Sequence, residues 1–440
     1  MADPKVSKEA SSSPGSSPGN EPFIPLKLAE FENAAKRIAD FVQLTPLRKW
    51  DYLRRHLKFE APCFIKLENF QNTGSFKVRG AANKILKLIE ENPKVNHFVA
   101  ASAGNHAQAV AFTAGRLGRV STIVMPEGTP IVKAAATQDY GANVILHGAV
   151  YDEAYKKACE VLESTPGSVY VHAYADRDVI LGQGTIGLEV DRQLTEMGIA
   201  RDQEIQVVIP TGGGGLVSGM GGCLKLLRPK TKVFGVVCEA APMMALSFAQ
   251  KQILQPKPGR SRTLAEGLAV KSVHPLTFDM ILHTVDEFAI IDDGNIARAI
   301  ALLMERGKTV AEGAGAAGIA AAISGGLNLN PKIPLVVIIC GGNIDMNIVT
   351  KILDRAHSDE MRSVRLDLLV EDRPGELAKI ANEIGSLRAN ILEVSHDRLG
   401  MKCPVGYTRI QFQIETRGRS HVEEIQRHLT SQGYRLEKST

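Results

Sequence analysis

The chain has 440 residues, of which 44% are hydrophobic and 23% charged; these values are ordinary for folded globular proteins and suggest two or three domains. A formal net charge of +4, without a long Lys/Arg cluster, argues against nucleic acid as a partner. No stretch reaches about 18 uninterrupted apolar residues, so we expect no membrane span.

The cysteines and the first residues bear on the compartment. The six cysteines stand at 63, 159, 223, 238, 340 and 403, and none forms a Cys-x-x-Cys pair. This spacing indicates neither a zinc site nor a disulfide framework, and reduced thiols favour a cytoplasmic location. Residues 1–22 are rich in Ser, Pro and Gly and lack the apolar core of a secretory signal, so we expect a disordered tail.

Residues 23–355 show one repeating pattern. After a helix expected over 28–42, short Val/Ile-rich runs alternate with Gly or Ser turns and amphipathic helices. The expected strands are 64–67, 97–100, 121–125, 143–146, 169–172, 205–210, 232–238 and 334–340. The alternation predicts an α/β architecture of parallel strands with crossover helices, and it places the chemistry beyond the carboxyl ends of the strands.

The pattern changes after a charged segment, 356–363, which we expect to be a linker. A strand (364–370), a helix (376–387), two strands (390–396 and 407–414), a helix (421–431) and a closing strand follow. This βαββαβ order predicts a separate ferredoxin-like domain over residues 364–440.

Lys77 lies in the motif Ser-Phe-Lys-Val-Arg-Gly at 75–80, where a polar turn meets a helix expected over 78–91. A desolvated lysine loses its proton more readily and becomes a nucleophile for an aldehyde. Alone the motif has little weight, because most lysines are solvated surface groups.

A second motif, Ser-Ala-Gly-Asn-His-Ala at 102–107, follows a strand and opens a helix. Asn105 can donate a hydrogen bond to a ligand oxygen. Equally, Ser102 or Asn105 can cap the helix.

The third motif is Thr-Gly-Gly-Gly-Gly-Leu at 211–216, between a strand and a helix that begins near Val217. Four glycines expose backbone N–H groups at a helix N-terminus, which favours an anion such as phosphate. No Gly-Lys-Ser/Thr follows, so this is not a Walker loop. A plain flexible loop is the alternative, but four glycines are costly in entropy without a use.

The fourth motif, Cys-Gly-Gly-Asn at 340–343, follows the strand 334–340. A small polar side chain there can face a ring nitrogen. The alternative is that Cys340 is simply a small buried apolar residue.

These four motifs, with Gly-Gln-Gly-Thr at 182–185, resemble the fold-type II pyridoxal-phosphate family. Within it they resemble the threonine/serine dehydratase branch, which includes serine racemase. The resemblance covers about residues 23–351 and implies two open, twisted, mostly parallel sheets, with a small subdomain at about 70–172 inserted in the large one. It also implies pyridoxal 5′-phosphate as cofactor and β-elimination of L-threonine to 2-oxobutanoate and ammonia, with L-serine giving pyruvate.

The resemblance assigns roles to individual residues. Lys77 would bind the cofactor aldehyde covalently and, once the substrate amine displaces it, remove the α-proton. Asn105 would contact the 3′-oxygen, and Cys340 would face the pyridine nitrogen, where many relatives have serine. The phosphate would be held by Gly212, Gly213, Gly214, Gly215 and Leu216, the ring would be lined by Phe76 and Glu312, and the substrate carboxylate would be bound by Ser102, Ala103, Gly104, Asn105 and His106.

Some of these assignments have alternatives. Glu312 can equally be a helix N-terminal carboxylate. His172 and Tyr174 follow a strand and can line the cleft. Glu239 matches one ligand of the divalent metal bound by racemase-like relatives, but residues 240–246 contain no second acid. We therefore assign no divalent metal, and a monovalent cation is the open alternative.

Two other functions compete with threonine dehydratase. The first is serine racemase or a serine-preferring dehydratase. Racemases of this branch carry a second serine immediately before Gly-Asn, whereas this chain has Ala103, so we expect elimination to dominate. The second is a non-catalytic amino-acid sensor, against which the retention of Lys77 and the glycine loop argues.

The segment Glu-Asp-Arg-Pro-Gly-Glu-Leu at 371–377 resembles the turn of ACT-like regulatory domains. Such domains pair and bind a small amino acid near this turn, which suggests a homo-oligomer, dimer or tetramer, with an effector such as isoleucine or valine. The implied effector residues are Asp372, Pro374, Gly375, Leu377 and, opposite them, Asn390. The alternative is that the tail only dimerises the enzyme.

Overall fold

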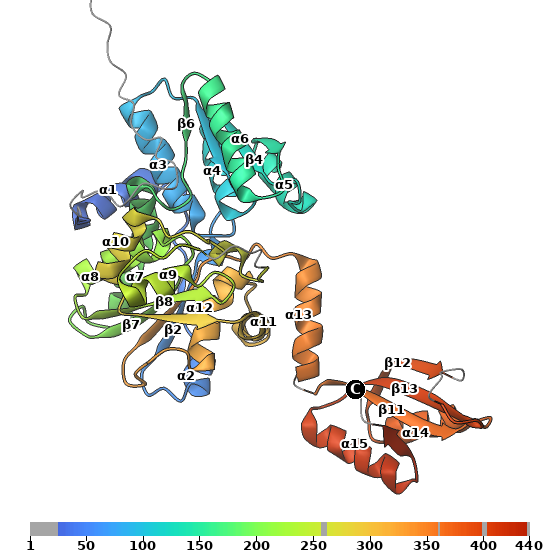
Figure 1. Cartoon of the computed structure of the whole chain (residues 1–440). Coiled ribbons are helices and arrows are strands. Elements are labelled where there is room, and N and C mark those ends of the chain that lie inside the picture. The colour runs from blue at the N-terminus through green and yellow to red at the C-terminus, as the bar shows by residue number, and fades with distance from the viewer. Residues whose placement is uncertain (1–24, 257–261, 360, 398–402, 438–440) are drawn as a thin grey trace, which may run out of the picture. The chain divides into compact units, whose positions relative to one another are not determined.

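The computed structural model describes residues 25–256, 262–359, 361–397 and 403–437 (Figure 1). The tail expected over residues 1–22 lies outside the described residues. The chain divides into two compact units, Met1–Asn343 and Ile344–Thr440. Helix α13, Met346–Asp359, belongs to the second unit and covers the start of the segment 356–363 that we expected to be a linker. The boundary that we expected near residue 355, between the first domain and the linker, stays a prediction.

The larger sheet of the first unit has the order β1-β2-β10-β7-β8-β9. All its neighbours are parallel except the edge strand β1, which runs antiparallel to β2. The strands are β1 Leu47–Lys49, β2 Cys63–Leu67, β7 Ile205–Pro210, β8 Thr231–Cys238, β9 Glu287–Ile291 and β10 Leu335–Ile339. Strands β2, β7 and β10 are buried along their whole length, as expected for strands covered on both faces.

The smaller sheet has the order β5-β4-β3-β6, and every pair is parallel. Its strands are β3 His97–Ala101, β4 Val120–Met125, β5 Asn143–Leu146 and β6 Ser168–Tyr170, all within the segment 70–172. In Figure 1 this sheet and helices α3 to α6 form the upper part of the first unit. The α/β class with two mostly parallel sheets is therefore confirmed.

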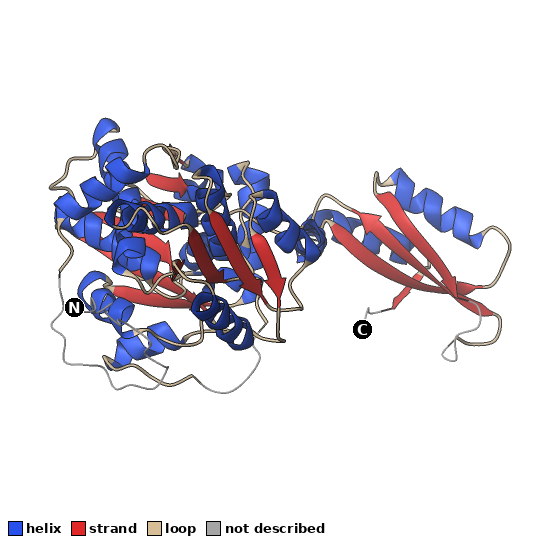
Figure 2. Cartoon of the chain, turned by 90° about the horizontal axis from the view of Figure 1, so that it is seen from above, coloured by secondary structure: helices blue, strands red, loops and turns tan. Residues whose placement is uncertain are grey.

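Crossover helices connect the parallel strands of the first unit. Figure 2 colours the helices blue and the strands red. The helices of the first unit are α1 Leu28–Ile38, α2 Asp51–His56, α3 Lys77–Glu91, α4 Asn105–Arg116, α5 Ile131–Asp139, α6 Tyr151–Ser164, α7 Arg177–Glu196, α8 Gly222–Leu227, α9 Met243–Gln250, α10 Pro275–Thr284, α11 Asp293–Leu302 and α12 Gly313–Ser324. None of the described helices is long and apolar enough to cross a bilayer.

Helix α12 shows how composition sets position. Its sequence consists almost entirely of Gly, Ala and Ile, and nearly all of it is buried. Small side chains let it pack closely against the larger sheet: a Cβ on Gly315 would lie 2.1 Å from the Gly341 carbonyl, and one on Gly318 would lie 2.8 Å from Val337. Its N-terminus, at Glu312, is therefore held against the end of β10.

The second unit has the expected ferredoxin-like order. After α13 come β11 Ser363–Glu371, α14 Glu376–Ser386, β12 Asn390–Asp397, β13 Tyr407–Glu415, α15 Arg419–Ser431 and β14 Arg435–Glu437. The sheet is antiparallel with the order β12-β13-β11-β14. Alternate strand residues such as Leu368 and Phe412 pack with Ile380 of α14 and Ile425 of α15, so both helices cover one face.

Candidate active site

The site follows from the order of the larger sheet. Strand β10 lies between β2 and β7, so the carboxyl ends of these three parallel strands meet at one edge. The segment after β2 leads to Lys77, the segment after β10 is the motif at 340–343, and the segment after β7 is the glycine loop at 211–216. The smaller sheet adds the segments after β3 and β6.

Lys77 opens α3, and its Nζ donates a hydrogen bond to the carbonyl of Ala173, 2.9 Å away. The same Nζ lies 5.1 Å from the centre of the Phe76 ring. The side chain is partly accessible, yet it lies deep within the unit. Removal from water disfavours the ammonium form and lowers the pKa of Lys77 to about 8. A lysine with this pKa can act as a nucleophile and as a base near neutral pH.

Ser75 and Phe76, which precede Lys77, form hydrogen bonds with the residues that follow β10. Phe76 donates its backbone N–H to the carbonyl of Cys340 at 3.1 Å, and Ser75 pairs with Gly341 in an isolated bridge. The first and fourth motifs of the sequence are therefore joined through their backbones.

The glycine loop at 212–215 has no room for side chains. A Cβ on Gly213 would lie 2.4 Å from the ring of Tyr174, and one on Gly212 would lie 2.6 Å from the carbonyl of Gly267. Gly214 has φ +94°, a conformation that favours glycine. Leu216 is buried and leads into the helical turn Val217–Gly221. The backbone can thus approach a ligand closely at the N-terminus of a helix.

His172 shapes the turn after β6, which ends at Tyr170 rather than at the expected residue 172. Its Nδ1 accepts hydrogen bonds from the backbone N–H groups of Tyr174 and Ala175, at 3.2 and 2.8 Å. Burial lowers the pKa of His172 to about 4, which keeps the ring a neutral acceptor. The turn presents the Ala173 carbonyl to Lys77 and the Tyr174 ring to the glycine loop.

Asn105 is the first residue of α4, and its side chain does not cap the helix. Its Nδ2 donates to Glu312 Oε1 at 2.6 Å, and its Oδ1 accepts from Asn343 Nδ2 at 2.8 Å. Ser102 accepts a hydrogen bond from the N–H of Gly104, which precedes the helix. The capping alternative for this motif is therefore wrong for both side chains.

Glu312 precedes α12, and its side chain makes no cap. Glu312 is therefore a helix N-terminal carboxylate, as the alternative had it, and its role beside a cofactor ring stays a prediction. Burial raises the pKa of Glu312 to about 7, although the hydrogen bond from Asn105 favours the charged form. The carboxyl group is thus poised between its protonated and ionised forms at neutral pH.

Cys340 is buried beside these groups. Desolvation raises the pKa of its thiol well above the ordinary value, so the side chain stays a neutral thiol. It can give a ligand a weak S–H donor or a sulfur acceptor, but no negative charge.

The loop at 102–105 is partly exposed. A Cβ added to Gly104 would meet nothing within 4 Å, so open space lies next to the loop. The Nε2 of His106 donates a hydrogen bond to the Val171 carbonyl at 2.8 Å, and burial lowers the pKa of His106 to about 3. The imidazole is used inside the protein, which leaves only the backbone of His106 to meet a carboxylate.

Some site groups had no predicted role. Asn343 lies in the fourth motif, but only the structure shows that its Nδ2 bridges Asn105 and the Thr73 carbonyl at 2.8 Å each. The hydroxyls of Thr73 and Ser75 are buried and have no hydrogen-bond partner among the described residues. The motif spacing was the available signal for Asn343, whereas backbone carbonyls such as that of Ala173 leave no signal in a sequence.

In the second unit, the expected effector residues lie between β11 and α14, in the first turn of α14 and at the start of β12. Gly375 precedes α14 with φ +93°, and Asp372 donates its N–H to the Gly406 carbonyl at 2.9 Å. Asn390 begins the edge strand β12 and reaches Glu415 at 3.4 Å. The two other residues expected there, Pro374 and Leu377, are exposed.

Three comparisons place the chain among known proteins. The family model described as "Pyridoxal-phosphate dependent enzyme" matches residues 38–341. L-threonine ammonia-lyase of Thermotoga maritima is 43% identical over 413 residues, which are 93% of this chain and 99% of that protein. This share exceeds the first unit, so the match extends into the second.

Solved structures of related enzymes have a similar fold. The processed form of threonine deaminase isoform 2 from Solanum lycopersicum is 32% identical with a TM-score of 0.67, covering 79% of this chain and 94% of that one. Maize serine racemase is 29% identical with a TM-score of 0.68, covering 77% of this chain and 100% of that one. The chain belongs to the pyridoxal-phosphate dependent enzyme family.

Proposed function

We propose that this chain is an L-threonine ammonia-lyase, which converts L-threonine to 2-oxobutanoate and ammonia and also accepts L-serine. The observation that carries the proposal is the placement of the Lys77 amine. It is held by Ala173 in the same short turn whose Tyr174 ring covers the glycine loop. The threonine ammonia-lyases and deaminases among the relatives support the choice of reaction.

The residues present fit pyridoxal phosphate. The loop at 212–215 excludes side chains, which leaves its backbone N–H groups for an anion. The buried hydroxyls of Thr73 and Ser75 have no partner among the described residues and are suited to a ligand with oxygen atoms. When bound, the cofactor captures the substrate amine covalently and draws electrons away from the α-carbon.

The chain's own residues would divide the remaining work. Lys77 Nζ would hold the cofactor and then take the α-proton, for which a pKa of about 8 is suitable. The Asn105 amide, fixed by Glu312 and Asn343, would orient the ring. The Cys340 thiol would face the ring nitrogen without ionising. The open space beside Gly104 would receive the substrate carboxylate.

Serine racemase is the second candidate, because the maize racemase shares the fold at 29% identity. A racemase needs an acid/base on the face opposite the lysine. The methyl side chain of Ala103 has no exchangeable proton, at the position where such enzymes have serine. We therefore favour elimination.

We further propose that the second unit is an ACT-like regulatory domain and that the enzyme works in the cytoplasm as a homo-oligomer. The exposed edge strand β12, with Leu392 54% exposed and Val394 41% exposed, supports pairing with a second copy. The six unpaired cysteines support a reducing compartment.

The first test is Lys77→Ala in the full chain. We expect purified wild type to show the visible absorbance of a bound cofactor and to produce 2-oxobutanoate from L-threonine. Lys77→Ala should lose both while keeping its unfolding temperature near that of cofactor-free wild type. Lys87→Ala, a substitution of a more exposed lysine on the same helix, should keep both. Wild type without cofactor absorbance would contradict the proposal and favour a non-catalytic amino-acid sensor.

The second test addresses the racemase. We expect wild type to eliminate L-serine without measurable D-serine, because Ala103 cannot exchange a proton with the α-carbon. Ala103→Ser should raise D-serine formation at least about tenfold, since a positioned acid/base contributes on the order of a hundredfold or more. Chiral chromatography of the products checks this, and rapid racemisation by the wild type would contradict it.

The third test uses the pKa of Glu312. Burial raises it from 4.5 to about 7, so the folded state holds a proton that the unfolded state has already lost. The contribution of Glu312 to the free energy of unfolding of the wild type is therefore highest below pH 4.5. It falls as the pH rises to about 7, by roughly 3 kcal/mol at most. In urea unfolding of the cofactor-free protein, Glu312→Gln should therefore gain stability relative to wild type across this range. Parallel pH curves for the two proteins would contradict the assignment.

The fourth test concerns the second unit. L-isoleucine or L-valine should raise the unfolding temperature of the full-length enzyme and change its rate. Gly375→Val should weaken this response, because φ +93° at the turn strains any side chain there. Arg427→Ala, an exposed change on α15, should leave the response intact. If neither amino acid alters stability or rate, the unit only dimerises the enzyme.

A further inference from the structure

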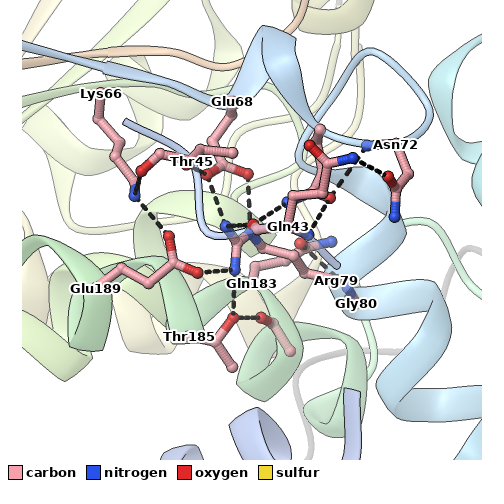
Figure 3. Close-up of polar contacts among 12 residues, drawn as sticks. Gln43, Thr45, Lys66, Glu68, Asn72, Arg79, Gly80, Gln183, Thr185 and Glu189 are labelled. Carbon is pink, nitrogen blue, oxygen red and sulfur yellow. Dashed lines mark hydrogen bonds and ion pairs between the residues drawn. The ribbon is translucent and has the colours of Figure 1, made fainter. Parts of the chain in front are cut away.

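Behind the start of α3 lies a buried charge cluster, formed by Lys66 of β2, Glu68 of the turn after β2, Arg79 of α3 and Glu189 of α7 (Figure 3). Glu189 is the most exposed side chain, at 15%; the others are at 1% or less. Two positive and two negative charges balance. The cluster joins β2 and α3 to α7, which is distant from both in sequence.

Arg79 is the centre of the cluster. Its Nε and Nη2 donate to both oxygens of Glu68, at 2.8 and 2.9 Å. Its Nη1 donates to Glu189 at 2.7 Å and to Thr185 at 3.2 Å, and Nη2 also reaches the Gln43 carbonyl at 3.4 Å. A guanidinium has five N–H groups, so every donor has an acceptor.

Lys66 completes the charge balance. Its Nζ donates to Glu189 at 2.5 Å and to the Thr45 carbonyl at 2.7 Å. Burial by itself opposes ionisation of Glu189, but Arg79 and Lys66 together hold the pKa of that carboxyl below its usual value. Burial likewise lowers the pKa of Lys66, and the carboxylates of Glu189 and Glu68 oppose that lowering.

Stability alone does not account for such a cluster. Removing charges from water costs several kcal/mol per ion, and packed apolar residues of similar volume often stabilise a fold equally well. A hydrogen-bonded ion cluster is directional, whereas apolar packing is not. Its bonds can form only when the attached helices and strands have one particular arrangement.

That arrangement includes the position of Lys77. Residues two apart on an α-helix point about 200° from each other, so Arg79 reaches into the cluster while Lys77 points to Ala173 on the opposite side. The start of α3 has no side-chain cap that could fix it instead. Lys66 lies near the end of β2, opposite Ile338 of β10, and Glu68 directly follows β2.

We propose that Arg79 and Glu189 are positioning residues, which fix the first turn of α3 against β2 and α7 and thereby hold the Lys77 amine at its working position. The inference rests on the proposed role of Lys77. Lysine cannot replace Arg79, because an ammonium lacks the planar fork that joins Glu68 and Glu189 at once.

A second buried ion pair, also anchored on α7, provides matched controls. Arg228 is completely buried and pairs with Asp191 of α7 at 2.8 Å, but its other partners are Thr195 and the carbonyls of Ile199 and Ala200. Among the described residues, the hydrogen bonds and ion pairs of Arg228 and Asp191 do not reach α3. Arg79→Lys is therefore compared with Arg228→Lys, and Glu189→Gln with Asp191→Asn.

Three quantities are measured on each full-length variant: the unfolding temperature, the rate at which cofactor-free protein takes up pyridoxal phosphate, and the visible circular dichroism per bound cofactor. Turnover of L-threonine is measured on the same samples. We expect both members of each pair to lose thermal stability. Only Arg79→Lys and Glu189→Gln should slow uptake and weaken the dichroism, with kcat falling on the order of tenfold to a hundredfold and KM little changed.

Equal uptake, dichroism and kcat per bound cofactor within each pair would overturn the inference and leave the cluster a structural one. If Arg79→Lys does not fold, the isosteric pair Glu189→Gln and Asp191→Asn decides the matter. Uptake and dichroism do not depend on the amino acid that the enzyme uses. A wild type that takes up the cofactor but does not convert threonine therefore counts against the proposed function alone.

Discussion

The parallel pairing of β10 with both β2 and β7 is the constraint on which the site depends. Its register sets Ile339 opposite Leu67, so Cys340 and the segment that leads to Lys77 leave the sheet side by side. The bond from the Phe76 N–H to the Cys340 carbonyl follows from this register. A slip of one residue would turn every β10 side chain to the other face and separate the two motifs.

Burial explains the shifted pKa values of the site residues. It moves Lys77, Glu312 and Cys340 toward their neutral forms, which brings the pKa of the lysine down to about 8 and that of the glutamate up to about 7. The pKa values of the Lys77 amine and the Glu312 carboxyl group therefore lie within about one unit of each other. Such matched values suit proton transfer near neutral pH, because each group can give up or accept a proton at little cost.

Much of this arrangement could be predicted, because it depends on patterns that a sequence displays. The Val/Ile runs predicted the strands that form the cores of both sheets, and the βαββαβ order predicted the second unit. The edge strand β1 was missed because two of its three residues are charged. The edge strand β9 was also missed, although four of its five residues are apolar. The bond of His106 to Val171, and those of Lys77 and Asn343 to carbonyls, depend on side-chain direction and burial, which residue types alone do not disclose.

The motif at 182–185 also has a physical explanation, which lies in how α7 packs against its neighbours. A Cβ on Gly182 would lie 2.4 Å from the Arg79 carbonyl, and one on Gly184 would lie 2.1 Å from the Phe31 ring, so α7 can approach α3 and α1 only with glycine there. The two polar residues of the motif bind the same helix: Gln183 accepts from the Gly80 N–H and Thr185 from Arg79. The motif therefore serves the first turn of α3, as the buried charge cluster does. Close packing and directional bonds thus converge on the helix that begins with Lys77.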